Sequence, residues 1–416
     1  KITIFALALL APLIFLLYFR FLEYNTANIK KNILSFNFSL TILNECLQKN
    51  YIYDFMKPFF GNGIVTADAI TWKKNRKLLN PAFNQNVLNS FIDVFNSQAL
   101  SLVDQFACEV GKLFGHGELL RINNMETICT TSLGIDSRKY SELQMQYLPR
   151  VLNLLKLVTE RIQRFWLHSD FIYNMTQRKK MQDEDLEKVL GKLKPFIDLV
   201  LDLAEDNDDF TDEHVRAEVD GNIGAGHDTT AALLTFTLTI LGSRTDVQDK
   251  AYNEVLHILG KEKKLVGQDD LSKLVYIDAV LKETLRLYPV IPLLGRRIHK
   301  DLKLKNYKIA ANSDCFCFLH GLHRHSIWGP DADQFRPERW LDKETLPDPK
   351  YFGGFGLGRR SCIGKSYAMM SMKITLAHVL RNYRISSDGV SKMVVTMEIV
   401  LRAESGHYIT LLHRDA

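Results

Sequence analysis

Residues 352–365 read FGGFGLGRRSCIGK, and this stretch says more about the fold than any other. Glycines at this density let a backbone press against a flat ligand, because they carry no Cβ to clash with it. Cys362 sits among them, just before residues 366–380, for which we expect a helix. Backbone N–H groups at a helix N-terminus favour an anion, so we expect Cys362 to be a thiolate.

Three interpretations of this loop compete. Gly364, Lys365 and Ser366 match the end of a phosphate-binding loop, but that motif requires glycine at position 359, which is arginine here. The second interpretation is a plain glycine turn around a structural cysteine. The third is a haem iron held by a cysteine thiolate, in which the glycines approach the flat ring and the cysteine binds the metal.

The composition is that of a globular protein with a large core. The chain has 416 residues, 46% of them hydrophobic, and a net charge of +5 from 53 Lys+Arg and 48 Asp+Glu. These values exclude a disordered, collagen-like or disulfide-stapled chain. No dense basic stripe with interleaved aromatics occurs, so we expect no nucleic-acid binding. Six scattered cysteines are typical of reduced intracellular thiols.

The first segment predicts a membrane anchor. Residues 2–19 are almost wholly apolar, and as a helix they would span about 27 Å. Basic residues follow, beginning with Arg20, which favours a cytosolic position for the rest of the chain. The alternative is a cleaved secretory signal, but no small-residue cleavage site follows Phe19. The expected division is an anchor helix, a shortened linker and one large domain, at residues 1–24, 25–42 and 43–416.

The large domain reads as mostly helical with small sheets near its end. Long helices are expected over residues 212–242 and 272–288, and Pro289 stops the second. The alternation of apolar and polar residues over 397–412 predicts a β-hairpin turning around residues 404–406.

Five motifs resemble one family. Phe355, Gly358, Arg360, Cys362 and Gly364 reproduce the F-x-x-G-x-R-x-C-x-G haem-binding signature of the cytochrome P-450 monooxygenases. Four further elements match that family in order along the chain: W-x-x-x-R at 72–76, AGHDTT at 225–230, ETLR at 283–286 and FRPERW at 335–340. The resemblance runs from about residue 43 to the end and is strongest to the microsomal family-four branch. It implies a mainly α fold with small β-sheets.

The resemblance assigns roles around the haem. Cys362 would be the axial ligand of the iron, shielded by Phe355 and the amides of the loop. Thr229 would hold oxygen and water, while Asp228 would relay protons. A hydroxyl and a carboxylate can deliver the two protons that O–O cleavage needs in a dry cavity.

The same resemblance implies two sets of charged residues. Glu283, Arg286 and Arg339 would form a buried triad that fixes the backbone below the haem. Burying the two haem propionates requires cations, because an unpaired buried charge is costly. The residues expected to meet the propionates are Trp72, Arg76, Arg360 and Arg296.

The chain departs from the family in two respects. It is shorter than typical members, both before Leu43 and between Arg178 and Asp198, where the lid helices are expected. An inactive, truncated haem protein or a lipid-binding remnant is therefore the alternative function. Ala225 also stands where the family-four branch often has a glutamate linked covalently to the haem. The haem b of this chain should therefore be bound without a covalent link.

The expected function is insertion of one oxygen atom from O2 into a small lipophilic molecule, such as a fatty acid, a lipid hormone or a xenobiotic. A haem-thiolate isomerase or dehydratase is less favoured, because Asp228 and Thr229 are both present. The substrate is expected to contact four residues, Ile223, Ala225, Val290 and Leu293.

The expected electron source is NADPH, through NADPH-cytochrome reductase, with cytochrome b5 as a second donor. A basic face formed by Lys73, Lys74, Lys77 and Lys365 suits an acidic flavoprotein partner. The expected location is the endoplasmic reticulum membrane, with a single span and the catalytic domain in the cytosol.

Overall fold

The computed structural model describes residues 42–43, 45–134, 148–192, 212–260, 264–303, 308–342, 344 and 346–414. The expected anchor at 1–24, nearly all of the linker and residues 193–211 lie outside these ranges. Among the helices of the described ranges, none combines the length and the apolar character that crossing a membrane demands. The anchor therefore stays a prediction.

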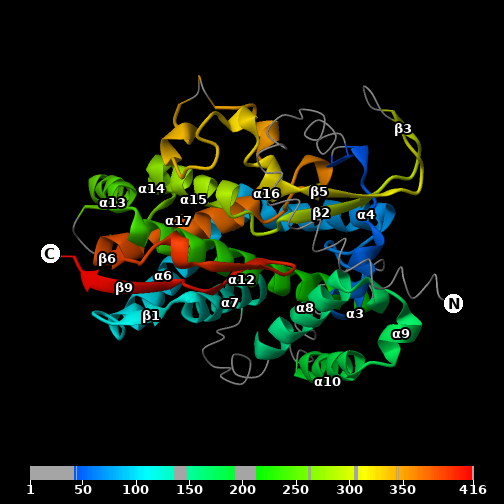
Figure 1. Ribbon diagram of the computed structural model, residues 1–416. Helices are drawn as coiled ribbons and strands as arrows, with labels where there is room; N and C mark the ends of the chain where they lie inside the picture. Colours follow the sequence, from blue (N-terminus) through cyan, green and yellow to red (C-terminus); the bar gives the residue numbers. More distant parts are fainter. Residues whose placement is uncertain are drawn as a thin grey trace.

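Helices make up most of the described chain (Figure 1), as expected. The α-helices are α3 Lys57–Phe60, α4 Ala69–Leu79, α5 Gln85–Ser90, α6 Ile92–Ala107, α7 Gly117–Leu133, α8 Leu148–Gln163, α9 Asp170–Asn174, α10 Gln177–Lys192, α12 Asp212–Ser243, α13 Thr245–Leu259, α14 Gln268–Lys273, α15 Val275–Leu287, α16 Leu319–Leu322 and α17 Lys365–Asn382. The 3-10 helices are η1 Tyr51–Met56, η2 Asn80–Phe83, η5 Phe165–Leu167, η6 Ser326–Trp328, η7 Pro337–Trp340, η8 Pro349–Tyr351, η9 Gly358–Arg360 and η10 Val390–Lys392.

The strands form small antiparallel sheets. They are β1 Leu113–Gly115, β2 Leu293–Arg297, β3 Leu302–Lys303, β4 Lys308–Ile309, β5 Asp314–Phe318, β6 Tyr383–Ser386, β7 Val394–Met397, β8 Leu401–Ser405 and β9 Tyr408–His413. One sheet has the order β1-β9-β6, and the other described pairs are β2-β5, β3-β4 and β7-β8.

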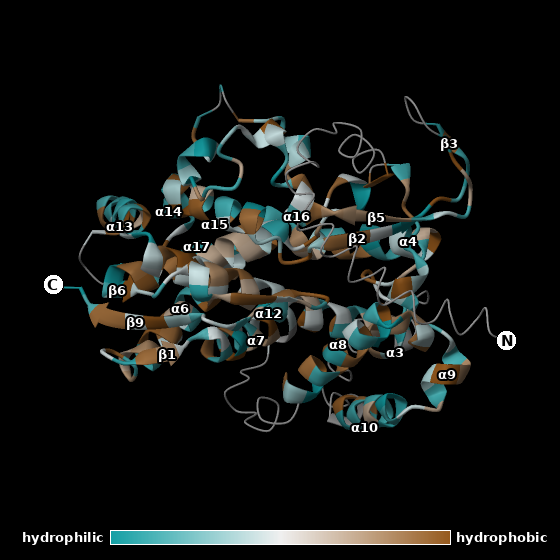
Figure 2. Ribbon diagram, in the orientation of Figure 1, coloured by the Kyte–Doolittle hydropathy of each residue, from teal (hydrophilic) through white to brown (hydrophobic). Residues whose placement is uncertain are grey.

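The long helix α12 is the centre of the molecule. It passes between α7 and α17 (Figure 1) and also packs against α15. Its bounds, Asp212–Ser243, agree with the expected helix at 212–242. Figure 2 shows hydrophobic residues gathered along these central elements, whereas the outer helix α10 is more hydrophilic. Burial of this apolar surface is the main force that holds the fold together.

The helix expected over 272–288 is divided in the structure. Leu274 takes a non-helical conformation, with φ −72° and ψ 68°, and thereby separates α14 from α15. The second of these helices ends at Leu287, one residue before Tyr288 and two before Pro289, in accord with the predicted stop.

The prediction that the chain forms a hairpin turning at residues 404–406 is wrong, because the two strands that flank this turn do not pair with each other. The chain does form strands on either side, but β8 pairs with β7, and β9 leaves to pair with β6 and β1. Gly406 separates them with φ +76°, and a Cβ there would lie 2.1 Å from the Lys392 carbonyl oxygen. The tight turn of the true hairpin therefore falls at residues 398–400, between β7 and β8.

Candidate active site

A cavity of about 370 Å³ lies between the cysteine loop and α12. Its lining is mostly apolar. The predicted haem-binding residues on its wall are Cys362, Phe355, Gly364, Arg360 and Arg296.

Positive φ angles shape the loop that carries Cys362. Gly356 has φ +75° and Gly358 has φ +69°, conformations that favour glycine. The loop closes on itself because the Cys362 N–H donates to the Phe355 carbonyl at 2.7 Å. At Gly354 a Cβ would meet the Leu285 side chain at 2.6 Å, so the loop also packs too closely on α15 for a larger residue.

Opposing influences act on the thiol of Cys362. The side chain of Cys362 is exposed to the cavity but lies deep among protein atoms, and this desolvation raises its pKa, while the Gly364 N–H, Arg76 and Lys365 lower it; desolvation is the largest of these effects. The net direction of the pKa shift is thus opposite to that which favours a thiolate, and the thiolate stays a prediction. A metal cation at this sulfur would oppose the effect of burial, because a coordinating thiol is deprotonated by the metal.

The cavity wall carries cations that suit the carboxylates of a haem. Among the described residues, Arg296 Nε and Arg360 Nη1 are buried polar atoms without a hydrogen-bond partner. Lys49, which the sequence did not single out, lines the same cavity, and Arg296 and Arg360 both lower its pKa, after burial. The pKa of Arg360 falls to about 9, mainly through burial. Two buried carboxylates would relieve this unfavourable cluster, so the residues fit the propionates of a haem.

Trp72 and Arg76 support the loop from α4 and do not line the cavity. The Arg360 guanidinium lies 4.6 Å from the centre of the Trp72 ring, a cation–π contact. Arg76 donates from Nη1 to the Ser361 carbonyl at 2.7 Å. In the described structure these two residues thus hold Arg360 and the backbone beside Cys362.

The triad forms as the motifs predict. Arg286 donates to both oxygens of Glu283, each at 2.8 Å, and Arg339 Nε reaches Glu283 Oε1 at 3.2 Å. All three side chains are buried. The Trp340 indole and the Arg336 backbone N–H also donate to Glu283, at 2.9 and 3.0 Å, so its carboxylate is fully satisfied.

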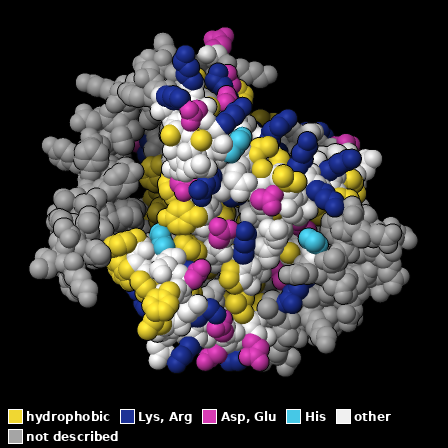
Figure 3. All heavy atoms as spheres, turned by 90° about the vertical axis from the view of Figure 1, so that its right-hand side faces the viewer, with side chains coloured by type: hydrophobic (Ala, Val, Ile, Leu, Met, Phe, Trp, Pro, Cys, Tyr) yellow, Lys and Arg dark blue, Asp and Glu magenta, His cyan; other side chains and the backbone are white. Residues whose placement is uncertain are grey.

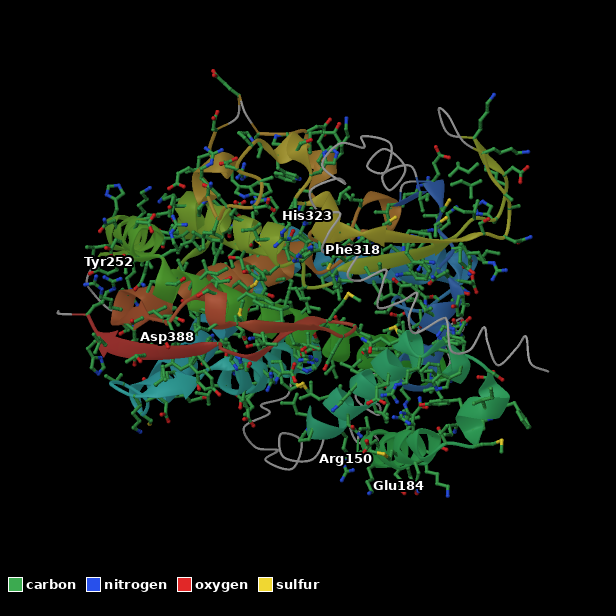
Figure 4. All side chains as sticks on the ribbon, in the orientation of Figure 1. Arg150, Glu184, Tyr252, Phe318, His323 and Asp388 are labelled. Carbon is green, nitrogen blue, oxygen red and sulfur yellow. The ribbon has the colours of Figure 1, made fainter. Side chains whose placement is uncertain are left out.

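His323 links this triad to the cysteine loop. Arg286 Nη1 donates to the His323 carbonyl at 2.7 Å. The His323 Nε2 accepts from the Gly353 N–H at 2.9 Å, and its ring stacks on Phe352 at 5.5 Å between ring centres. Figure 4 labels His323, which follows α16, and Phe318, the last residue of β5. The triad therefore fixes the start of the loop through one buried imidazole.

Thr229 lies on the cavity wall in the middle of α12. Its hydroxyl donates to the Ala225 carbonyl at 2.7 Å, a bond to the fourth preceding residue. The helix continues unbroken through this turn.

Asp228 points away from the cavity and into an ion pair. Arg402, on β8, donates to its two oxygens at 2.8 and 2.6 Å, and the carboxylate is buried. The carboxylate of Asp228 therefore does not border the cavity. The motif placed Asp228 beside Thr229, but only Thr229 lines the cavity, because the Asp228 side chain is turned toward Arg402.

Three of the four predicted substrate residues, Ala225, Val290 and Leu293, line the cavity. Ile223 does not, contrary to the prediction, because it is fully buried in the core and its carbonyl accepts from the His227 ring at 2.7 Å. The sequence missed Glu398, which does line the cavity. Its position after strand β7 gave no motif by which to find it.

Comparison with known proteins defines the class of this fold and site. The family model described as cytochrome P450 matches residues 43–411. A crystal structure of a cytochrome P450, CYP102L1, superimposes with a TM-score of 0.77 over 88% of each chain at 22% identity, and so shares the fold. The chain therefore belongs to the cytochrome P450 family.

Its relatives carry family 4 names. Mouse cytochrome P450 4V2 is 29% identical over 403 aligned positions, covering 88% of this chain and 77% of the relative. Cytochrome P450 4c3 of Drosophila melanogaster is 27% identical over 417 positions, covering 90% of this chain and 78% of the relative. Membership implies, in general terms, a haem with its iron and monooxygenase chemistry of the P450 type.

Proposed function

We propose that this protein is a haem-thiolate monooxygenase that inserts one oxygen atom from O2 into a small lipophilic molecule. The observation that carries the proposal is the cavity bounded by Cys362 on one side and by Thr229 on the other. A thiolate ligand and a hydroxyl facing each other across a mostly apolar space suit oxidation of an unreactive carbon. The family 4 names of the relatives support the same class of reaction.

Cys362 would hold the haem iron, and Arg296, Arg360 and Lys49 would hold its propionates. The haem, when bound through a thiolate, supplies the oxidising chemistry by favouring O–O cleavage. Ala225 presents only a methyl group to the cavity, so no covalent link to the haem forms at this position. The haem should therefore be extractable.

Residues of the chain itself would position water and supply protons. Thr229 donates its own hydrogen to the Ala225 carbonyl, which leaves its oxygen free to accept a hydrogen bond from water in the cavity. Asp228 would contribute protons only when its pair with Arg402 loosens. The apolar wall excludes bulk water and keeps a lipophilic substrate in place.

The substrate class follows from the lining. Side chains such as Ile128, Leu233 and Ile399 surround the cavity together with the predicted residues Ala225, Val290 and Leu293. Such a wall binds a fatty acid chain, a lipid hormone or a lipophilic xenobiotic by excluding water from its apolar surface.

Electrons would come from NADPH through NADPH-cytochrome reductase, with cytochrome b5 as a second donor. The Arg76–Ser361 bond places α4 beside the cysteine loop. Lys73, Lys77 and Lys365 are exposed on these two elements. A basic surface next to the thiolate suits an acidic donor and brings it within reach of the haem.

The proposed location is the endoplasmic reticulum membrane, with the domain in the cytosol and residues 1–24 as its anchor. Apart from that segment, η5 and α9 expose large hydrophobic side chains: Phe165, Trp166, Phe171, Ile172 and Met175. Figure 3 shows the face of the molecule on this side, where hydrophobic side chains gather between charged ones. Exposed aromatic and aliphatic side chains together suit contact with a lipid surface.

The test is the reduced, carbon-monoxide difference spectrum of membranes that contain the full chain. A band at about 450 nm is expected, because Cys362 would bind the iron as a thiolate. Cys362→Ser should lose that band. Incubation with reductase, NADPH and lipophilic candidates should then give products that carry one added oxygen atom.

A band at about 420 nm in the wild-type chain, or no bound haem, would overturn the proposal, because either result would show that the thiolate ligand does not form. The expected thiolate band without product from any lipophilic candidate would favour the alternative, an inactive haem protein or a lipid-binding remnant.

A further inference from the structure

One carboxylate on α12 holds two other parts of the chain. Glu218 Oε1 accepts from Asn75 Nδ2 at 2.6 Å, and Glu218 Oε2 accepts from the Ile64 N–H at 3.0 Å. Asn75 belongs to α4, and Ile64 belongs to the turns of residues 61–67. Glu218 is 6% exposed and does not line the cavity, so it is not placed to meet a substrate.

Hydrogen bonds rather than a cation hold this carboxylate. Burial raises the pKa of Glu218 and its two hydrogen bonds lower it, and no charged side chain of the described residues adds to these effects. Arg216, on the same helix, pairs with Asp220 instead, at 3.6 Å. A buried carboxylate is costly unless its oxygens are satisfied, so the two donors are fixed where they stand.

Helix α4 connects α12 to the cysteine loop. Arg76, which follows Asn75, donates to the Ser361 carbonyl at 2.7 Å. Trp72, one turn before Asn75, has the Arg360 guanidinium 4.6 Å from the centre of its ring. The hydrogen bond between α4 and α12 therefore sets where α4 meets the loop.

The turns of residues 61–67 reach the same guanidinium. Arg360 Nη2 donates to the Ala67 carbonyl at 2.9 Å. The turns also press closely on α12, because a Cβ at Gly61 would lie 2.6 Å from the Ala217 Cβ. The backbone hydrogen bond from these turns to α12 therefore fixes the place at which Ala67 offers its oxygen to Arg360.

The guanidinium held in this way offers one donor to the cavity. Arg360 lines the cavity, and its Nε donates to the Leu47 carbonyl at 2.9 Å, while Nη2 is engaged by Ala67. Its Nη1 is buried without a partner in the described part of the chain. Two of its three neighbours, Ala67 and Trp72, belong to the segments that Glu218 holds. The direction of the donor that a haem propionate would meet thus depends on Glu218.

We propose that Glu218 is a positioning residue that fixes Arg360, and with it the cysteine loop, relative to α12. The inference rests on the haem-binding part of the proposed function and deepens it. Glu218 acts through the side chains and turns that it holds, without contact to haem or substrate. Because Thr229 lies further along the same helix, this link also sets the spacing between the hydroxyl and the cysteine across the cavity.

The experiment measures how fast haem leaves the full chain in lipid nanodiscs. Transfer of the haem to an excess of apomyoglobin gives the rate constant of release without any turnover. Glu218→Leu removes both acceptors and should raise this rate constant about tenfold. Glu218→Gln should raise it less than about twofold, because its carbonyl accepts from Ile64 and its amide donates to the oxygen of a turned Asn75 side chain.

Two further variants separate this link from a general loss of stability. Asn75→Ala breaks only the bond to α4 and should raise the rate constant about fivefold, and it keeps the test in hand if Glu218→Leu does not fold. Asp220→Asn is the matched control, because Asp220 is buried on the same helix but pairs with Arg216. This control should leave haem release unchanged.

A double variant tests the route through Arg360. Glu218→Leu combined with Arg360→Gln should release haem at most about twofold faster than Arg360→Gln alone, whereas independent effects would make it about tenfold faster. Independent effects, or equal acceleration in Asp220→Asn, would overturn the proposal. Unchanged release in both Glu218→Leu and Asn75→Ala would do the same while leaving the proposed function intact. A wild-type chain that binds no haem would overturn the proposed function and this inference with it.

Discussion

The two walls of the cavity are built in different ways. On the cysteine side, the triad of Glu283, Arg286 and Arg339 and the loop around Cys362 come from one stretch of the chain and hold one another through buried hydrogen bonds. On the opposite side, Asp228 and Arg402 do not line the cavity themselves but pair behind its wall, 174 positions apart along the sequence. The first wall follows from local motifs, whereas the second depends on how remote elements pack together.

The largest expected effect tests the cysteine side. Glu283→Ala should abolish haem incorporation, because it leaves the buried Arg286 without a carboxylate and Arg339 with Asp331 alone. Breaking a buried pair in this way costs about 3–5 kcal/mol. The measurement is the haem content of the purified protein, together with its free energy of unfolding.

Glu338→Ala serves as the control for this change. Glu338 lies next to Arg339 but is 38% exposed; it makes a surface pair with Lys250 at 2.6 Å and accepts from the Tyr276 hydroxyl at 2.8 Å. Such pairs contribute about 0–1 kcal/mol, so haem content should remain normal. Normal haem content in Glu283→Ala as well would refute the role of the triad.

The same contrast explains what could be predicted. The long helix α12 follows from the sequence pattern, whereas the haem loop as a haem site, the triad and the cavity positions of Ala225, Val290 and Leu293 follow from the resemblance of the motifs to the family. Lys49, Arg402 and Glu398 could not be found that way, because they carry no motif. Lys49 reaches the cavity from the segment before η1, and the pairing of β7 with β8 brings Glu398 to the cavity and Arg402 to Asp228. The error at residues 404–406 has a related cause, since alternation identifies a strand but not its partner.

The second prediction tests the opposite wall. Arg402→Gln leaves Asp228 buried without its cation and should lower the free energy of unfolding by about 3 kcal/mol. Adding Asp228→Asn removes the stranded charge and should restore most of that loss. Urea unfolding of the wild type, both single variants and the double variant measures this coupling. A double variant as unstable as Arg402→Gln would show that the pair contributes little.

The third prediction concerns the hydroxyl on the cavity wall. Thr229→Ala should lower the product formed per NADPH consumed by about tenfold, because the oxygen that positions water is lost. Haem content should not change. Thr237→Ala is the control, since Thr237 makes the same kind of bond, to the Leu233 carbonyl at 2.8 Å, but does not line the cavity. Equal losses in both variants would assign the effect to the helix rather than to the cavity.

The smallest expected effect concerns Asp220, which lies nearer the N-terminus of α12 than Asp228 and does not line the cavity. Burial raises the pKa of Asp220 to about 6 from 3.8, even though Arg216 opposes this shift. The folded state therefore keeps a proton that the unfolded chain has lost, so this group makes the fold less stable as the pH rises from about 4 through 6. Asp220→Asn removes that penalty. The Asp220→Asn variant should therefore have a higher free energy of unfolding than the wild type, and this difference should be about 1 kcal/mol larger at pH 7.5 than at pH 5.

Asp246 has the opposite sign and is the control for that measurement. The guanidinium of Arg244 holds the pKa of Asp246 below its usual value, so this group stabilises the fold above that range. Asp246→Asn should therefore give no gain at neutral pH. A gain in Asp220→Asn that grows as the pH falls would mean that the carboxylate is stabilised in the fold, and that α12 tolerates a buried charge near its start as well as it does at Asp228.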